Sequence, residues 1–180
     1  MGRLNSNPVL QIINQCEEIK QEVKYPEGLL QFEGNNWQAF YHIHTNNASI
    51  NHLFEGEHGH FHIFAKVSEQ PAAWSHVAAL SMDLMGQPLR WFMVNHWVTG
   101  EKWVGASILI EKLNEIFLSE KNALVQKWLL AMLVVYKQEV TSLLKARDKL
   151  LESQDKELFL KDKEIYLLTE KAIKLEDKFK

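Results

Sequence analysis

The segment Glu57-His58-Gly59-His60-Phe61-His62-Ile63-Phe64 places a histidine at every second position over five residues. Successive side chains of a β-strand point to opposite faces of a sheet, so this spacing predicts a strand with His58, His60 and His62 on one face. The apolar residues between and after them would cover the other face and pack into a core. The segment therefore predicts a half-buried strand that carries a group of imidazoles on its second face.

Segments on both sides of this strand predict a sheet with helices. Aromatic and β-branched alternation predicts four strands, and a return to helical spacing predicts two helices after them. An N-terminal helix would begin at Asn7-Pro8 and end at the turn Tyr25-Pro26-Glu27-Gly28. We therefore expect an α+β fold, an antiparallel sheet with flanking helices. The expected strands are 36–45, 58–67, 75–83 and 89–98, and the expected helices are 104–117 and about 122–139.

In residues 142–180, apolar residues recur every seven positions. Such a heptad repeat is typical of a coiled coil, so we expect an α+β domain at 1–141 and a long coiled-coil helix at 142–180. The tail carries 10 basic and 9 acidic residues, a balance that suits a solvated helix whose flanking charges select a partner. Self-association or a protein partner is the expected role, and a single helix packed on its own domain is the alternative. The heptad residues are Leu144, Leu151, Leu158, Ile165, Ala172 and Phe179.

Composition excludes several classes of partner. The chain has 180 residues, 46% of them hydrophobic, and a formal net charge of −3, so neither nucleic acid nor an anionic membrane is an expected partner. No apolar run approaches the length of a membrane span, and the first residues lack an apolar signal core, so a cytoplasmic location is expected. The single cysteine, Cys16, cannot form an intrachain disulfide, which leaves histidine and carboxylate as metal ligands.

The histidines are concentrated in one part of the chain. All eight lie between His42 and His96, a window in which a random distribution would place about two. His42 and His44 form a second alternating pair on the preceding strand. Antiparallel pairing of the two strands would bring this pair beside His58 or His60. Two to four imidazoles are therefore expected to converge on one face of the sheet.

This cluster predicts a transition-metal site, because neutral imidazole is the commonest metal ligand in proteins. A carboxylate from Glu55 or Glu57 would complete the two-histidine, one-carboxylate set of non-haem iron, whereas histidines alone suit zinc or copper. The expected function is binding of iron, copper or zinc, with metal-dependent catalysis as its extension. The alternative is an adaptor or scaffold that acts through the coiled coil and uses its histidines structurally. The candidate ligands are His58, His60 and His62, with help from His42, His44 or Glu57.

Three other histidines are expected to have structural, hydrogen-bonded roles. They are His52, His76 and His96. His76 begins the third predicted strand and His96 ends the fourth, so a simple meander would place these two near each other. They would lie at the opposite end of the sheet, outside the main cluster.

The segment 58–64 resembles the motif of the histidine triad nucleotide hydrolases and transferases. The resemblance implies that His60 would attack a phosphorus atom, with His58 and His62 in support. Gly59 departs from the motif, since that family has a bulky apolar residue there. The Gly-rich nucleotide segment of the family is replaced by Asn46-Asn47-Ala48-Ser49-Ile50-Asn51.

Two segments together resemble a set of uncharacterised bacterial proteins, over roughly residues 30–140. These are Gly56-Glu57-His58-Gly59-His60-Phe61-His62 and Trp97-Val98-Thr99-Gly100-Glu101. The resemblance brings no assigned activity, but it implies that both segments belong to one site, with Asn95, Thr99 and Glu101 at its rim. The alternative for the second segment is a strand end followed by a helix start, with Thr99 as the cap.

Overall fold

Among the described residues, six strands form a meander that is the framework of the fold. The computed structural model describes residues 7–13, 20, 23–34, 36–44 and 55–174. Every strand pairs antiparallel with its neighbour in sequence, in the order β1-β2-β3-β4-β5-β6. The predicted antiparallel sheet is confirmed. The strands are β1 (Lys24–Gln31), β2 (Trp37–His42), β3 (Gly59–Glu69), β4 (Ala72–Met82), β5 (Pro88–Val94) and β6 (Leu167–Ala172).

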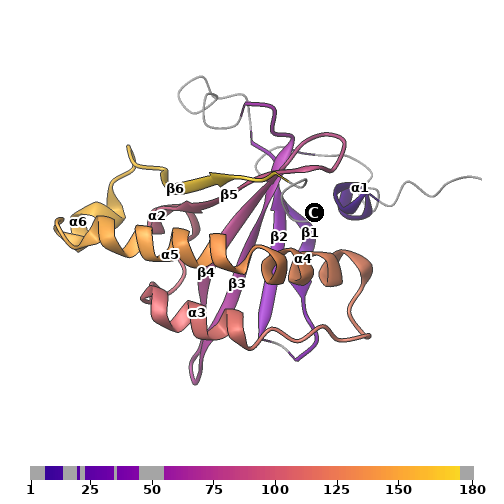
Figure 1. The fold of residues 1–180 in the computed structure, drawn as a ribbon, viewed down its shortest axis with the longest axis horizontal. Helices are drawn as coiled ribbons and strands as arrows, with labels where there is room; N and C mark the ends of the chain where they lie inside the picture. Colours follow the sequence, from indigo (N-terminus) through magenta and orange to yellow (C-terminus); the bar gives the residue numbers. More distant parts are fainter. Residues whose placement is uncertain (1–6, 14–19, 21–22, 35, 45–54, 175–180) are drawn as a thin grey trace, which may run out of the picture.

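The larger helices cover one face of this sheet. In Figure 1, α3, α4 and α5 lie across the face turned toward the viewer, and α1 lies beside β1 and α4. The predicted α+β arrangement of an antiparallel sheet with flanking helices is therefore confirmed. The helices are α1 (Pro8–Ile13), α2 (His96–Thr99), α3 (Ala106–Asn114), α4 (Leu124–Val135), α5 (Lys137–Leu151) and α6 (Lys156–Lys161).

The alternation of β3 separates two cores. Phe61 and Ile63 are fully buried in the main core, which the sheet forms with helical residues such as Leu109 and Leu129. The face of the sheet opposite the main core carries His60 and His62, and we call it the histidine face. A smaller apolar cluster covers part of the histidine face near β5 and β6. Its buried members are Ala79, Phe92, Val94 and Tyr166.

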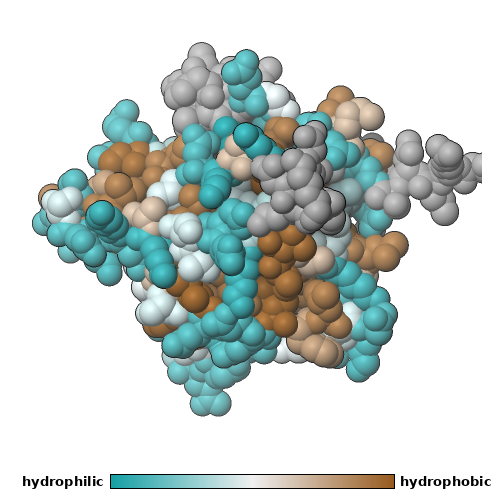
Figure 2. Space-filling view, in the orientation of Figure 1, coloured by the Kyte–Doolittle hydropathy of each residue, from teal (hydrophilic) through white to brown (hydrophobic). Residues whose placement is uncertain are grey.

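The helical side presents a mixed surface. Figure 2 shows an apolar area between charged side chains on this side of the molecule. Large exposed apolar residues in and before α4 include Phe117, Leu124, Val134 and Val135. Within the described ranges, no helix combines the length and the apolar character that crossing a bilayer requires.

The first strand replaces a predicted turn. The turn predicted at Tyr25-Pro26-Glu27-Gly28 lies inside β1, which is an edge strand, and an edge tolerates proline because its free side needs no N–H partner. The pairing of β1 with β2 shifts register between Tyr25 and Leu30. Gly28 and Leu29 have positive φ angles of 85° and 67° at this shift. The turn residues therefore mark a bulge within a strand.

The end of the fourth predicted strand is also corrected. The prediction extends this strand to Val98, whereas β5 ends at Val94 and the next residues form the short helix α2. The side chain of Asn95 accepts a hydrogen bond from the His96 backbone N–H, at 2.7 Å, and caps this helix. A cap residue therefore overrides the alternating pattern of the sequence.

The long C-terminal coiled-coil helix is not observed. The described part of residues 142–180 contains most of α5, then α6, and then β6. Asp155 begins α6 as a new N-cap, because its side chain accepts hydrogen bonds from the N–H groups of Glu157 and Leu158. The heptad leucines consequently have unrelated environments: Leu144 is fully buried in the main core and Leu158 is 71% exposed.

Residues 167–172 form a strand and not a helix because β5 would otherwise be an unpaired edge of the sheet. Without β6, the backbone N–H and C=O groups on one side of β5 would lack strand partners, and pairing with β6 satisfies them. This tertiary hydrogen bonding outweighs the heptad pattern. The predicted boundary at 141/142 falls inside α5, and the sheet includes residues from both sides of it. Self-association or partner binding through residues 142–180 stays a prediction, now without a coiled coil to support it.

Leu144 and Leu158 occupy equivalent heptad positions, so a coiled coil would bury both, whereas the observed fold buries only Leu144. Leu144→Ala should lower the free energy of unfolding by about 2–5 kcal/mol, because it leaves a cavity in the main core. Leu158→Ala should change it by no more than about 0.5 kcal/mol, because that side chain is exposed. Urea denaturation of both variants measures this, and equal losses would support the coiled coil instead.

Candidate metal centre

The register of the sheet brings histidines from two strands together. His42 of β2 pairs with His60 of β3, which is one of the approaches that antiparallel pairing predicted for His42 or His44 with His58 or His60. The same row continues through Ser81 of β4 to Arg90 of β5. His62 lies in the next row on the same face, and its ring, like that of His60, is almost fully buried. Neighbouring strands thus build a polar row beside two buried imidazoles.

Three histidines offer nitrogen atoms to a common point. Among the described residues, one ring nitrogen each from His42, His60 and His62 lie within 4.8 Å of one another. The Nε2 atoms of His60 and His62 are 2.9 Å apart. Two nitrogens bound at about 2.0–2.1 Å to one ion are about 2.9 Å apart at a right angle and about 3.4 Å apart at the tetrahedral angle. This pair therefore has a spacing that suits two ligands of one ion.

Glu57 holds His60 from the side opposite His62. Its Oε1 atom lies 2.6 Å from His60 Nδ1, and its Oε2 atom accepts a hydrogen bond from the Ser81 hydroxyl and lies 3.6 Å from the Arg90 guanidinium. Burial alone would raise the pKa of the Glu57 carboxyl, but His60, Ser81 and Arg90 together lower it below its ordinary value.

The ionised carboxylate fixes the proton on His60. A carboxylate can only accept hydrogen bonds, so the Nδ1 atom of His60 must donate, and the Nε2 atom of a neutral ring keeps its lone pair. That lone pair is on the side of His62. Glu57 was predicted as a ligand, but both of its oxygens are engaged. This position suits the outer partner of a histidine that could bind a metal ion.

His76 holds His62 in a similar way, with its Nε2 atom 3.1 Å from His62 Nδ1. The prediction that His76 lies outside the cluster is therefore wrong. The prediction placed His76 at the start of its strand, whereas β4 begins at Ala72 and His76 pairs with Phe64, close to His62. The pairing of β4 with β3 also shifts register at this point, with Val77 as the extra residue. Val77 and Ala78 both contribute to the main core, so His76 falls on the histidine face.

The buried rings next to His60 are neutral. Burial lowers the pKa of His62 well below its ordinary value, and the surrounding histidines lower it further. Burial, together with Arg147 and His60, lowers the pKa of His76 to about 3. Neutral imidazole is the form that binds a metal ion, so His62 is in a binding-competent state at neutral pH.

His44 lies beside this group without joining it. Its ring centroid is 4.4 Å from that of His42 and 4.9 Å from that of His60. Its Nε2 atom is 3.2 Å from the hydroxyl of Tyr166. Sequence reasoning missed Tyr166, because it placed this residue in the coiled coil.

His58 is turned away from His60 and His62. Its Nδ1 atom is 2.9 Å from the hydroxyl of Tyr41, a residue of the main core, and the two rings are stacked. The predicted common face therefore holds for His60 and His62 but does not extend to His58, because β3 begins only at Gly59.

Gly59 has a steric role at this point of the strand. A Cβ atom on residue 59 would lie 2.5 Å from the carbonyl oxygen of His42 and 2.7 Å from the hydroxyl of Tyr41. Glycine is thus needed for the close approach of β2 and of the Tyr41 ring. This explains why it stands where the histidine triad motif has a bulky residue. Glu55, the other predicted carboxylate, is exposed.

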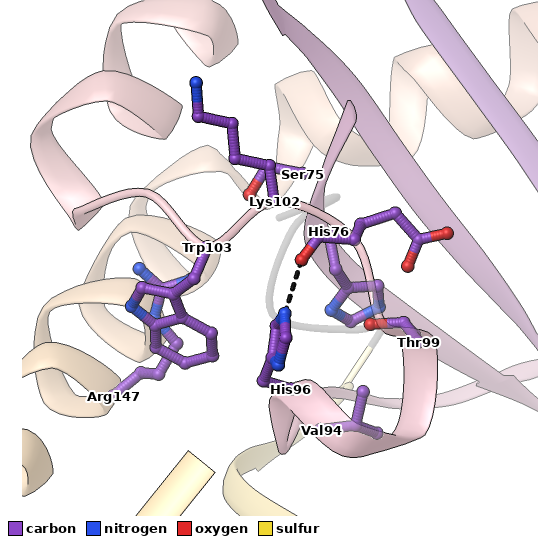
Figure 3. Close-up of a pocket in the computed structure, with 9 residues that line it drawn as sticks. Ser75, His76, Val94, His96, Thr99, Lys102, Trp103 and Arg147 are labelled. Atoms are coloured by element: carbon purple, nitrogen blue, oxygen red, sulfur yellow. Dashed lines mark hydrogen bonds between the residues drawn. The ribbon is translucent and has the colours of Figure 1, made fainter. Parts of the chain in front are cut away.

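The second segment of the predicted site meets the histidines through His76. His76, Thr99 and Glu101 line one small cavity of about 10 Å³, enough for about one water molecule. Figure 3 shows His76 and His96 on one side of it, and Trp103 with Arg147 on the other. The remaining lining residues are Ser75, Val94 and Lys102.

His96 and Asn95 have structural roles beside this cavity. The Nε2 atom of His96 is 2.6 Å from the backbone carbonyl of Glu101, which confirms the predicted hydrogen-bonded role (Figure 3). Asn95, besides capping α2, donates from Nδ2 to the carbonyl of Phe159 and so ties α2 to α6. Thr99, the predicted cap, is the last residue of α2. His52 lies outside the described residues.

Comparisons with known proteins give a family but no activity. A family model described as a domain of unknown function (DUF6969) matches residues 1–173. This agrees with the predicted resemblance to an uncharacterised family. No curated protein and no solved structure matches the chain. The histidine triad resemblance thus finds no support, and His60, its predicted nucleophile, has its Nε2 atom against His62.

Stability of the metal-free protein should depend on pH through these histidines. The pKa of His76 falls from its ordinary 6.5 to about 3 on folding, so the unfolded chain takes up the proton first. The contribution of neutral His76 to the free energy of unfolding is complete above pH 6.5 and is lost as the pH falls toward 3. At about pH 5 the loss from His76 reaches up to about 2 kcal/mol.

His62 contributes with the same sign, because its pKa is also lowered. Urea denaturation at about pH 7 and about pH 5 measures the loss in the wild type and in His76→Gln. The variant should lose less stability over this interval. Equal losses in the two proteins would show that His76 does not titrate in this way.

Proposed function

Since the chain belongs to the DUF6969 family, whose description assigns no activity, we propose a function from the site alone. The protein binds a transition-metal ion through His42, His60 and His62. The observation that carries this proposal is the 2.9 Å approach of two Nε2 atoms whose Nδ1 atoms each face another partner. With a proton on each Nδ1, both Nε2 atoms hold lone pairs, and a metal ion is a group that both can bind.

The outer partners support this assignment. Ligating histidines almost always donate their second ring N–H to a carboxylate or another acceptor, which fixes the tautomer and the ring orientation. Glu57 is placed to do this for His60, and His76 for His62. Arg90 and Ser81 in turn hold Glu57. The rings are thus oriented by the protein before any ion arrives.

The donor set favours zinc or copper among the three predicted metals. Three neutral imidazoles suit both ions, whereas the common non-haem iron site includes a carboxylate ligand. Glu57 does not supply that ligand, because both of its oxygens have other partners. Three protein ligands also leave a position for water or substrate, the pattern of catalytic zinc sites. The proposal therefore includes metal-dependent catalysis.

The scaffold alternative has lost the feature that supported it. It required a coiled coil in residues 142–180, and the described residues there form α5, α6 and β6 instead. A scaffold with structural histidines would lose stability when His60 is replaced. A metal-binding protein would lose its ion, so metal content and folding must be measured together.

Protein purified without an affinity tag or chelator should contain about one zinc or copper ion per chain. His60→Ala and His62→Ala should lose this ion, because each removes a ligand from the group. His58→Ala is the matched control, since that neighbouring ring is turned toward Tyr41, and it should keep the metal. Elemental analysis with circular dichroism tests this. A wild type without metal after reconstitution, or a folded His60→Ala protein that retains it, would refute the proposal.

The outer carboxylate should affect affinity without being a ligand. Glu57→Gln removes the charge that holds the proton of His60 and should weaken metal binding by about 10–100-fold. Glu55→Gln, an exposed carboxylate two residues away, is the control and should leave the affinity unchanged. Competition with a chromophoric chelator gives both affinities. Complete loss of binding in a folded Glu57→Gln protein would instead identify Glu57 as a ligand.

A further inference from the structure

A chain of hydrogen-bond contacts leads from Glu57 through three histidines to a cavity. The Oε1 atom of Glu57 lies 2.6 Å from His60 Nδ1, and the Nε2 atom of His60 lies 2.9 Å from His62 Nε2. The chain continues from His62 Nδ1 to His76 Nε2 at 3.1 Å. The His76 ring also lines the small cavity that includes Glu101 (Figure 3). Each contact joins two atoms that can share one hydrogen bond, so each needs one proton.

Without an ion, these contacts fix the protons in one order. The Glu57 carboxylate can only accept, so a neutral His60 donates from Nδ1 and has its lone pair at Nε2. His62 must therefore donate from Nε2 to His60, which leaves the lone pair of a neutral His62 at Nδ1. His76 in turn donates from Nε2 to that lone pair. Burial lowers the pKa of both His62 and His76, so each ring has a single proton, and the Nδ1 atom of His76 has a lone pair.

An ion bound to the Nε2 atoms of His60 and His62 requires the opposite order. His62 then carries its proton on Nδ1, as a ligating histidine does, and donates it to His76 Nε2. His76 therefore has its own proton on Nδ1. In this exchange the proton on His62 Nε2 is released to solvent, the proton on His76 Nε2 passes to His62 Nδ1, and His76 Nδ1 takes one proton from solvent. The number of protons on the rings is unchanged, so no ring gains a charge.

The cavity beside His76 can serve a proton on Nδ1. Lys102 lines the cavity and is exposed, so solvent reaches its rim. The Oε2 atom of Glu101 is buried and has no hydrogen-bond partner within the part of the chain that the structure describes. A carboxylate oxygen is an acceptor, and the cavity, at about 10 Å³, has room for about one water molecule. An N–H group on the cavity side of His76 thus has an acceptor available, directly or through one water.

We propose that His76 is a positioning residue that transmits metal binding at His62 to this cavity. Its proton is on Nε2 in the metal-free protein and on Nδ1, facing the cavity of Glu101, in the metal-bound protein. The inference rests on the proposed function, since the same ion causes the exchange. It adds that His76 offers the cavity a hydrogen-bond acceptor when the metal centre is empty and a donor when an ion is bound.

The test compares the ¹⁵N-labelled full chain before and after loading with Zn²⁺, at about pH 8, above the ordinary imidazole pKa of about 6.5. Long-range ¹H–¹⁵N spectra distinguish a ring nitrogen that carries a proton from one that does not. His76→Gln identifies the His76 signals by their loss. The proton of His76 should be on Nε2 without metal and on Nδ1 with Zn²⁺, so the ¹⁵N shifts of its two nitrogens should change in opposite directions.

His96 is the matched control, because it lines the same cavity but its Nε2 atom donates to the backbone carbonyl of Glu101. Its proton should stay on Nε2 with and without Zn²⁺. A His76 proton on the same nitrogen in both forms would overturn this inference and leave metal binding intact. A change at His76 that is accompanied by an equal change at His96 would also overturn it, because the cavity as a whole would then have rearranged. A chain that takes up no Zn²⁺ would refute the proposed function and this inference together.

Discussion

Buried imidazole rings require a partner for each ring nitrogen, and this requirement organises the second face of the sheet. An unpaired polar group in the interior costs free energy, and a charged ring costs more. His60 and His62 are buried beside each other in adjacent rows of this face. The structure supplies Glu57 on one side of the pair and His76 on the other. What remains between the two rings is a pair of nitrogens that face each other, and the proposed function follows from that pair.

The partners of His60 come from several strands of the sheet. Glu57 precedes β3, and it is held by Ser81 of β4 and Arg90 of β5. Arg90 also lies 3.3 Å from Glu170 of β6, at the far edge of the sheet. A row of side chains thus connects the histidines to the last strand of the chain. Replacement of one member leaves the next without a partner, so such a network stabilises the site only when it is complete.

The C-terminal segment has two roles in this arrangement. As β6 it closes the hydrogen-bonding edge of β5, and through Tyr166 it reaches the ring of His44. Asn95 and Trp97 hold this segment by hydrogen bonds to backbone carbonyls. The histidine segment and the Trp97–Glu101 region therefore belong to one neighbourhood for a physical reason. The Trp97–Glu101 region positions the C-terminal segment, and Tyr166 of that segment contacts His44. The cavity lined by Thr99 and Glu101 is also lined by His76.

Features that depend on the local period of side chains could be predicted from the sequence. Alternation in β3 predicted two faces, and antiparallel pairing of neighbouring strands predicted that His42 or His44 would approach His58 or His60, because both follow from backbone geometry. The structure selects the pair His42 and His60. His76 could not be placed from the sequence, since one extra residue in β4 reverses which face it occupies. His58 could not be placed either, because strand alternation stops at Gly59.

The conformation of the heptad segment, residues 142–180, depends on contacts that form only when the chain folds. Its pattern suited a helix, but the open edge of β5 lies more than 70 residues earlier in the chain than β6, and only folding brings the two together. The same holds for Tyr166 and His44, which are 122 positions apart in sequence. Contacts of this range leave no periodic signal in the residues that make them. They are set by where the sheet ends and by which backbone groups still need a hydrogen bond.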